Sequence, residues 1–223
     1  MNKTILVIAA HSDDEALGCS GVIARHVAEG DDVHLLFMTD GVSSRSGGGG
    51  GGEDNRLTFA QGASKILRVS SFSNLNFTDN EMDSTSLLDI VKEVENKILE
   101  FQPEIIYTHH VGDLNIDHQI THKAVITACR PQPEFCVKEI YAFEVLSSTE
   151  WQTPGLLPFS PNVFIDITDY IEIKKQVLEA YSEEMRKPPH SRSIENTMRL
   201  NALRGNSVGV DYAEAYQIIR LVR

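Results

Sequence analysis

The stretch "ILVIAAHSDDEALG", residues 5–18, decides how the rest of the chain is interpreted. Its first six residues are apolar, and a short apolar run of this kind is typical of a strand buried on both faces. The run ends in one histidine and three successive carboxylates: His11, Asp13, Asp14 and Glu15. Adjacent acids repel one another and lose hydration when buried, so folding does not ask for them there. We therefore expect a metal ion, an arginine or a helix start beside them.

Strand and helix patterns alternate along the first two-thirds of the chain. Apolar runs at 33–38 and 104–108 predict further buried strands, and a weaker strand is expected at 75–77. Helical patterns alternate with these strands. They run from Ala16 to Val27, over 56–67 and 87–101, and from near His118. The remaining pattern predicts strands at 137–145, 162–167 and 216–222, with helices from 168 or 169 to about 185 and at 195–203. This alternation predicts one α/β domain over residues 1–223, a Rossmann-like, mostly parallel, doubly wound sheet with helices on both faces.

Two polar clusters follow strands of this expected sheet. The first is His11 to Glu15, and the second is "YTHHVGDLNIDHQITH", residues 107–122. Ligands of such sheets bind beyond the carboxyl ends of the strands. Two histidines with one carboxylate and an open position for water are the ligands of a hydrolytic zinc site. His11 and Asp14 are three residues apart at a helix entrance and can converge on one ion, which leaves Asp13 as general base towards a metal-bound water.

The paired motifs resemble those of the LmbE-like or PIG-L-like metal-dependent de-N-acetylases, relatives of the enzyme that deacetylates N-acetylglucosaminyl-phosphatidylinositol. The likeness lies in His-x-Asp-Asp-Glu after the first strand and in an Asp-His that opens a later helix. "TDG" at 39–41 and "RGNSVGVDYAEAYQIIR" at 204–220 also match, so the resemblance covers nearly the whole chain. It implies a metal held by His11, Asp14 and His118, with Asp13 as base and Asp117 orienting a catalytic group.

The chain departs from that pattern at two positions. Ser12 stands where proline is usual, and Asn115 stands where many members have the first histidine of a His-Pro-Asp-His motif. In those members this histidine helps to stabilise the tetrahedral oxyanion of the reaction. Asn115 can donate a hydrogen bond but carries no charge, so we expect the metal and other donors to contribute more of this stabilisation. Asp113, His109 and His110 are candidates for protonating the leaving amine. His122 lies four residues after His118 and is interpreted as a packing or supporting histidine rather than a ligand.

Basic residues in two segments are the expected substrate contacts. Arg45 and Arg56 flank the glycine run 47–52, which is either an active-site lid or a surface insertion. "EMRKPPHSRS", residues 184–193, displays His190 and Arg192, and a guanidinium suits the hydroxyl groups of a sugar. His110 joins these arginines as an expected substrate contact.

Composition limits the partners. The formal net charge of −12 disfavours nucleic acid and an anionic membrane surface. No apolar run is long enough for a membrane span, and Cys19, Cys129 and Cys136 lack the spacing of a metal site or a disulfide framework. We expect a cytoplasmic protein, with a homo-oligomer left open.

The function that these features predict is zinc-dependent removal of acetyl from an N-acetylated sugar. The expected moiety is of the N-acetylglucosamine type, free or in a glycoconjugate or surface-polysaccharide precursor. One zinc ion per chain is expected, with another divalent metal as the alternative. A magnesium phosphohydrolase is the rival enzyme, and two histidines disfavour it. A catalytically idle sugar-binding module is the second rival, and it would have no need of Asp13. A nucleotide-binding oxidoreductase is a still weaker alternative, because Gly18-x-x-Gly21 does not match the dinucleotide-binding motif G-x-G-x-x-G.

Overall fold

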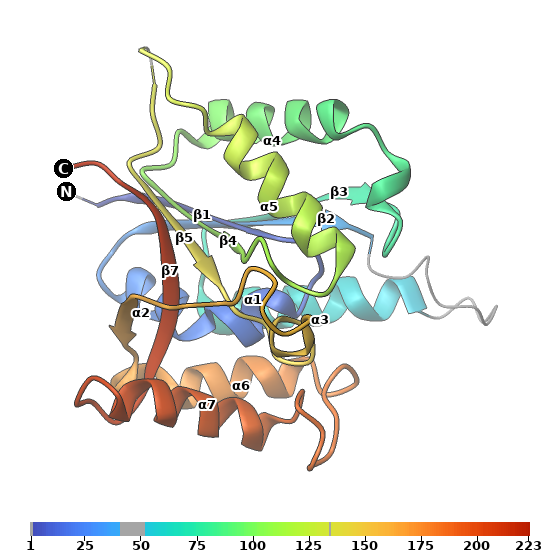
Figure 1. Cartoon of the computed structure of the whole chain (residues 1–223). Helices are drawn as coiled ribbons and strands as arrows, with labels where there is room; N and C mark the ends of the chain where they lie inside the picture. The colour runs from blue at the N-terminus through green and yellow to red at the C-terminus, as the bar shows by residue number, and fades with distance from the viewer. Residues whose placement is uncertain (1, 41–51, 134) are drawn as a thin grey trace.

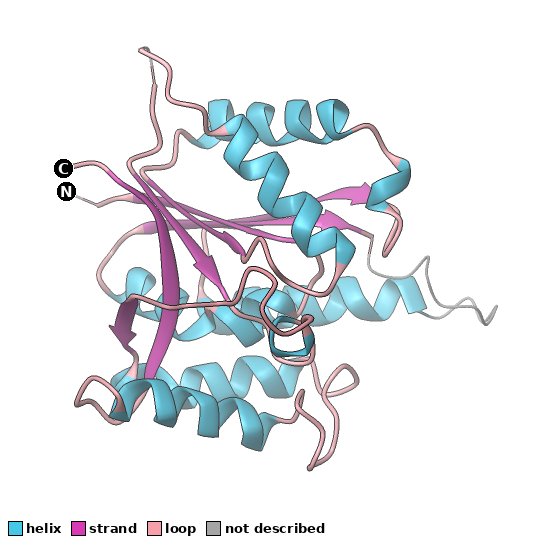
Figure 2. Ribbon diagram, in the orientation of Figure 1, coloured by secondary structure: helices cyan, strands magenta, loops and turns pink. Residues whose placement is uncertain are grey.

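One seven-stranded sheet organises the described part of the chain. The computed structural model describes residues 2–40, 52–133 and 135–223. The strands are β1 (Thr4–Ala9), β2 (Asp32–Thr39), β3 (Ser71–Phe77), β4 (Ile105–His109), β5 (Glu139–Phe143), β6 (Val163–Asp166) and β7 (Ala213–Leu221). Their order is β3-β2-β1-β4-β5-β7-β6 (Figures 1 and 2). The first five strands are parallel, and β7 runs antiparallel to both β5 and β6.

Helices cover both faces of the sheet (Figure 1). The described helices are α1 (Asp14–Gly18), α2 (Ser20–Ala28), α3 (Gly52–Leu67), α4 (Leu87–Phe101), α5 (Ile116–Ala128), α6 (Ile171–Ala180) and α7 (Ile194–Asn206). Short 3₁₀ turns are η1 (Met82–Ser84), η2 (Thr149–Trp151) and η3 (Thr168–Tyr170). Helices α4 and α5 lie on one face, and the other five lie on the opposite face.

Alternation along β1 creates the two cores. Ile5, Val7 and Ala9 pack in one buried cluster with residues of α1, α2, α3 and α6. Leu6 and Ile8 pack in the other cluster, with residues of α4 and α5. Successive strand side chains point to opposite faces, so a strand covered by helices on both sides has to be apolar throughout. The predicted single-domain α/β architecture with a mostly parallel sheet is confirmed.

Two expected helices differ from the structure. The pattern from Ala16 to Val27 predicts one helix, but Cys19 has φ −149° and separates α1 from α2. Glu214 of β7 accepts hydrogen bonds from the free N–H groups of Gly21 and Val22 at 2.9 and 2.8 Å. The helix expected from 168 or 169 to about 185 is η3 followed by α6, which ends at Ala180. At the α1–α2 break, the contact with distant Glu214 overrides the local pattern.

A buried ion pair joins α6 to β7 beneath this break. Lys174 Nζ lies 2.5 Å from Glu214 Oε1 and donates to the carbonyl of Leu17 at 2.9 Å. The side chains of Lys174 and Glu214 are buried. Each charge is therefore compensated by the other, and the removal of one partner leaves a buried, unpaired charge.

The strand order brings the two polar clusters together. β1 lies between β2 and β4, so the direction of strand addition reverses between β1 and β4. The pairing of Val7 with Tyr107 puts the carboxyl ends of both strands side by side. At this edge, the N–H of Ala10, which follows β1, donates to Nε2 of His109, the last residue of β4, at 2.8 Å. This reversal is the position at which open α/β sheets bind ligands.

Candidate metal centre

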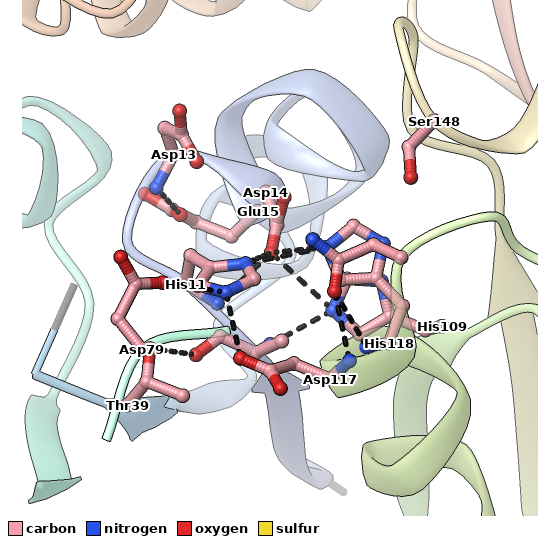
Figure 3. A network of polar contacts seen from close by, with 12 residues as sticks. His11, Asp13, Asp14, Glu15, Thr39, Asp79, His109, Asp117, His118 and Ser148 are labelled. Atoms are coloured by element: carbon pink, nitrogen blue, oxygen red, sulfur yellow. Dashed lines mark hydrogen bonds and ion pairs between the residues drawn. The ribbon is translucent and has the colours of Figure 1, made fainter. Parts of the chain in front are cut away.

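Three side chains from these two polar clusters, those of His11, Asp14 and His118, converge beyond the strand ends (Figure 3). Asp14 Oδ2 lies 3.1 Å from His11 Nδ1 and 3.2 Å from His118 Nε2. The two ring nitrogens are 3.3 Å apart, and all three side chains are buried. Burial by itself raises the pKa of Asp14, but the neighbouring His118 and His11 hold this pKa well below its usual range.

This arrangement fits a divalent cation. The donor atoms of His11, Asp14 and His118 lie within 4.8 Å of one another. The second carboxylate oxygen of Asp14 is buried and has no hydrogen-bond partner among the described residues. A buried polar atom without a partner costs free energy unless a ligand satisfies it. Two imidazole nitrogens with one carboxylate suit zinc better than magnesium.

The outer nitrogen of His11 is fixed by two further carboxylates. His11 Nε2 lies 3.0 Å from Asp79 Oδ1 and 3.2 Å from Asp117 Oδ2. Asp117 also accepts from the backbone N–H groups of Asn80 and Met82 at 2.7 and 3.1 Å. A carboxylate on the outer nitrogen orients a ligating imidazole, so Asp117 lies where an orienting residue has to be. Asp79 was not among the predicted site residues, and its signal in the sequence is a carboxylate shortly after the end of β3.

Asp113 lies behind the other histidine. Its Oδ1 is 3.1 Å from His118 Nδ1 and also accepts from the Ser148 hydroxyl. Thr149 Oγ1 donates to Asp113 Oδ2 at 2.6 Å. Burial raises the pKa of Asp113, but His118 and these hydroxyl donors lower this pKa by more than burial raises it. The carboxyl group therefore stays ionised. In this position Asp113 orients His118; donation of a proton to a leaving amine, the other role predicted for it, would require this ionised carboxylate to take up a proton first.

Asp13 points away from the three converging donors (Figure 3). Its backbone has φ 122°, a conformation that favours glycine, and its N–H donates to Glu15 Oε2 at 3.0 Å. Tyr181 donates its hydroxyl to the other oxygen of Glu15 at 2.7 Å. Arg192 Nη1 donates to Asp13 Oδ2 at 2.9 Å. Two adjacent aspartates thus have different neighbours: Asp14 faces the histidines, and Asp13 faces an arginine.

The start of α5 sets the position of Asn115. Its side-chain oxygen accepts from the N–H of Asp117 at 2.8 Å, as an N-cap does, and its Nδ2 donates to Asn80 Oδ1 at 3.0 Å. Asn115 thereby fixes the turn that presents His118. The interpretation of His122 as a packing histidine agrees with its contact, because His122 Nδ1 donates to the carbonyl of His109 at 2.8 Å.

His109 is a supporting residue of the same cluster. Its ring stacks on that of His118 with 3.9 Å between centroids. Burial lowers the pKa of His109 well below its usual value, and its Nε2 accepts from a backbone N–H. His109 is therefore neutral, which allows a stacked neighbour to carry a charge or a metal.

A cavity of about 250 Å³ opens over this cluster. Its lining residues are all polar or charged: His11, Asp13, Arg56, Asp79, Asn80, Asn115, His118, Ser147, Ser148 and Arg192. Arg56 pairs with Glu184 at 3.1 Å on one wall.

The other expected substrate contacts lie elsewhere. His110 is buried and its Nε2 donates to the carbonyl of Leu157 at 2.8 Å, outside the lining. His190 is exposed, beside Trp151. Arg45 and nearly all of the glycine run lie outside the described residues.

Comparisons with known proteins agree with the motifs. The model of the PIG-L family, GlcNAc-PI de-N-acetylase, matches residues 6–129. The uncharacterized deacetylase YaiS of Escherichia coli K12 is 32% identical over 187 residues, which are 80% of this chain and 90% of YaiS. Diacetylchitobiose deacetylase of Thermococcus kodakarensis is 28% identical over 199 residues, which are 82% of this chain and 70% of that protein.

A similar solved structure extends the likeness to the whole fold. 4-Carboxy-2-hydroxymuconate hydratase GalB from Pseudomonas putida superposes with a TM-score of 0.78 and 23% identity, over 99% of this chain and 98% of GalB. Because one fold carries different reactions, this likeness concerns architecture alone. Among the described helices, none combines the length and the apolar composition that crossing a bilayer requires. With a family model that spans more than half of its residues and a 32% identical relative, the chain belongs to the PIG-L family of GlcNAc-PI de-N-acetylases.

Proposed function

We propose that this protein is a zinc-dependent hydrolase that removes acetyl from an N-acetylated sugar of the N-acetylglucosamine type. The observation that carries the proposal is that Asp13 and Asp14, although adjacent, lie in different positions relative to the two histidines. Asp14 and two histidines offer a cation three donors, while Asp13 stays outside this set and lines the same cavity. A related protein, from Thermococcus kodakarensis, is a diacetylchitobiose deacetylase.

The chemistry follows from these positions. His11, Asp14 and His118 would hold the zinc ion, which when bound supplies Lewis acidity and an acidified water. Asp13 accepts the proton of the attacking water as the oxygen–carbon bond to the acetyl carbonyl forms. The carbon–nitrogen bond then breaks, and the proton passes to the sugar nitrogen, so the products are acetate and the free amine.

The other cavity residues have supporting roles in this proposal. Arg56 and Arg192 carry the guanidinium groups nearest to a bound sugar. Asn115 lines the cavity three residues before His118, and it stands where many family members have a histidine that acts towards the oxyanion. One of the two N–H groups of Asn115 Nδ2 donates to Asn80 Oδ1, and the substrate would accept from the other. Asp117 and Asp79 keep the imidazole of His11 in place.

The test is acetate release, with the metal measured in the same preparation. Purified protein is assayed on N-acetylated sugars that are free, nucleotide-linked or lipid-linked, and bound zinc is quantified. We expect acetate and a free amine in equal amounts, from protein that contains close to one zinc ion per chain. Release of phosphate from sugar phosphates in a magnesium-dependent manner would instead support the phosphohydrolase. Sugar binding without acetate release by zinc-loaded protein would support the binding module.

A further inference from the structure

Trp151 is the only tryptophan of the chain, and it is about half exposed, with 51% of its surface accessible. It ends η2, and its N–H donates to the carbonyl of Ser148, a lining residue of the cavity, at 3.2 Å. Burial of an indole ring is favourable, so a tryptophan with half of its surface exposed beside a cavity is unusual.

Trp151 is paired with His190 of the loop before α7. Their ring centroids are 5.7 Å apart at an interplanar angle of 71°, so the two rings form an edge-to-face arrangement, which we name the aromatic corner. The N–H of Arg192, another lining residue, donates to His190 Nδ1 at 3.0 Å. Trp151 and His190 are thus each hydrogen-bonded to a residue that lines the cavity, Ser148 and Arg192 respectively.

Hydrogen bonds hold the two segments together. Glu150 accepts from the N–H of Ser147 at 2.7 Å and from the hydroxyl of Ser191. Arg192 Nε donates to Ser147 Oγ at 2.9 Å. These hydrogen bonds link the segment around η2 to the loop before α7. Within that loop, Arg192 contacts both Asp13 in the cavity and His190 of the aromatic corner.

The cavity and the aromatic corner differ in what they can bind. The cavity has no apolar lining residue, and its volume of about 250 Å³ lies below the range of about 300 to 1,000 Å³ that is typical of sites for drug-sized ligands. It therefore has room for one acetamido sugar rather than two rings. The half-exposed indole of Trp151 offers an apolar ring surface, and the neighbouring residues in sequence, Glu150 and Ser191, carry polar groups that are hydrogen-bonded to each other. Such a surface suits a ring with apolar C–H faces and hydroxyl edges.

We propose that the aromatic corner of Trp151 and His190 is a subsite for a second sugar ring, linked to the N-acetylated sugar in the cavity. The inference rests on the proposed function, because it takes the cavity as the site of deacetylation. It makes Trp151 a residue that selects oligosaccharides over monosaccharides. It also gives His190 a substrate contact outside the cavity.

Kinetics of four proteins test this subsite. Wild type, Trp151→Ala, Trp151→Phe and Leu99→Ala are assayed on N-acetylglucosamine and on N,N′-diacetylchitobiose. Leu99, an exposed apolar residue of α4 outside the cavity lining, is the matched control. We expect Trp151→Ala to raise KM for the disaccharide about tenfold, in line with the loss of one aromatic stacking contact. The KM for the monosaccharide should stay within about twofold, Trp151→Phe should recover most of the loss, and Leu99→Ala should match wild type.

Octyl N-acetyl-β-glucosaminide separates a sugar ring from an apolar chain. If its KM depends on Trp151 while that of the disaccharide does not, the aromatic corner binds an alkyl group and the inference is wrong. Equal effects of Trp151→Ala on monosaccharide and disaccharide, or no effect on either, also overturn it.

Because Trp151 is the only tryptophan, its emission in wild-type protein reports on the subsite alone. We expect the disaccharide to shift this emission and the monosaccharide to leave it unchanged. If no sugar releases acetate, the proposed function is wrong. The emission titration then still decides whether the aromatic corner binds a second ring.

Discussion

Arg192 and Asp13 form an ion pair across 179 residues of sequence, with 2.9 Å between Nη1 and Oδ2. The Asp13 side chain is 2% exposed, and that of Arg192 is 22% exposed. Burial raises the pKa of Asp13, and the guanidinium of Arg192 opposes this rise. The loop before α7 thus controls the carboxylate that we propose as general base.

Arg192→Ala should lower kcat by about tenfold to a hundredfold, because Asp13 loses the contact that fixes its carboxylate. A side chain that only binds substrate would chiefly raise KM. The kinetic constants of Arg192→Ala and Arg192→Lys separate these roles, and lysine should restore part of kcat through its charge. Arg186→Ala is the control from the same loop, since Arg186 donates to the carbonyl of Glu183 and is exposed. A large rise in KM at unchanged kcat would contradict the positioning role.

Asp13→Asn and Asp14→Asn should fail for different reasons. Asp13→Asn should retain zinc and lose about 10²- to 10⁴-fold in rate, the usual effect of losing a general base. Asp14→Asn should bind zinc more weakly, and excess zinc should restore part of its activity. Zinc titration of both variants, with activity and bound metal measured together, is the test. Rescue of Asp13→Asn by zinc would exchange the two roles.

Removal of the metal should abolish activity and leave the fold intact. The sheet and both apolar cores are built from residues other than His11, Asp14 and His118. Treatment with a chelator, or the substitution His118→Ala, should therefore remove activity while circular dichroism stays that of the native protein. Zinc should restore the chelated wild type but not His118→Ala. Full activity in metal-free protein would refute the zinc proposal.

Lys174→Met should be strongly destabilising, although Lys174 lies outside the cavity. The substitution leaves Glu214 buried without its ammonium partner, a change that typically costs about 3–5 kcal/mol of unfolding free energy. The double variant Lys174→Met/Glu214→Gln removes the unpaired charge and should be more stable than the single one. Urea unfolding of both variants and wild type measures the difference. A loss below about 1 kcal/mol for Lys174→Met would show that the pair is not needed.

Some parts of the molecule follow directly from short stretches of sequence. The alternation of apolar runs with amphipathic segments predicts the mostly parallel sheet, and α4 spans the expected residues 87–101. His11 and Asp14 could be paired because they are three positions apart at a helix start. Local patterns decide these features because burial on both faces and helical periodicity act over neighbouring residues.

Other parts arise only when distant segments meet. The first turn of α2 is bonded to Glu214 of β7, and Tyr181, which follows α6, bonds to Glu15; both contacts join residues far apart in the sequence. Asp79 reaches His11 because β3 and β1 end at the same edge of the sheet, and Arg192 reaches Asp13 from the far end of the chain. The architecture and the proposed roles of the two aspartates could be predicted from the sequence, because each rests on residues close in the chain. The charge that faces each carboxylate could not be predicted in this way, because Coulomb and hydrogen-bond interactions depend on distance in space and not along the chain.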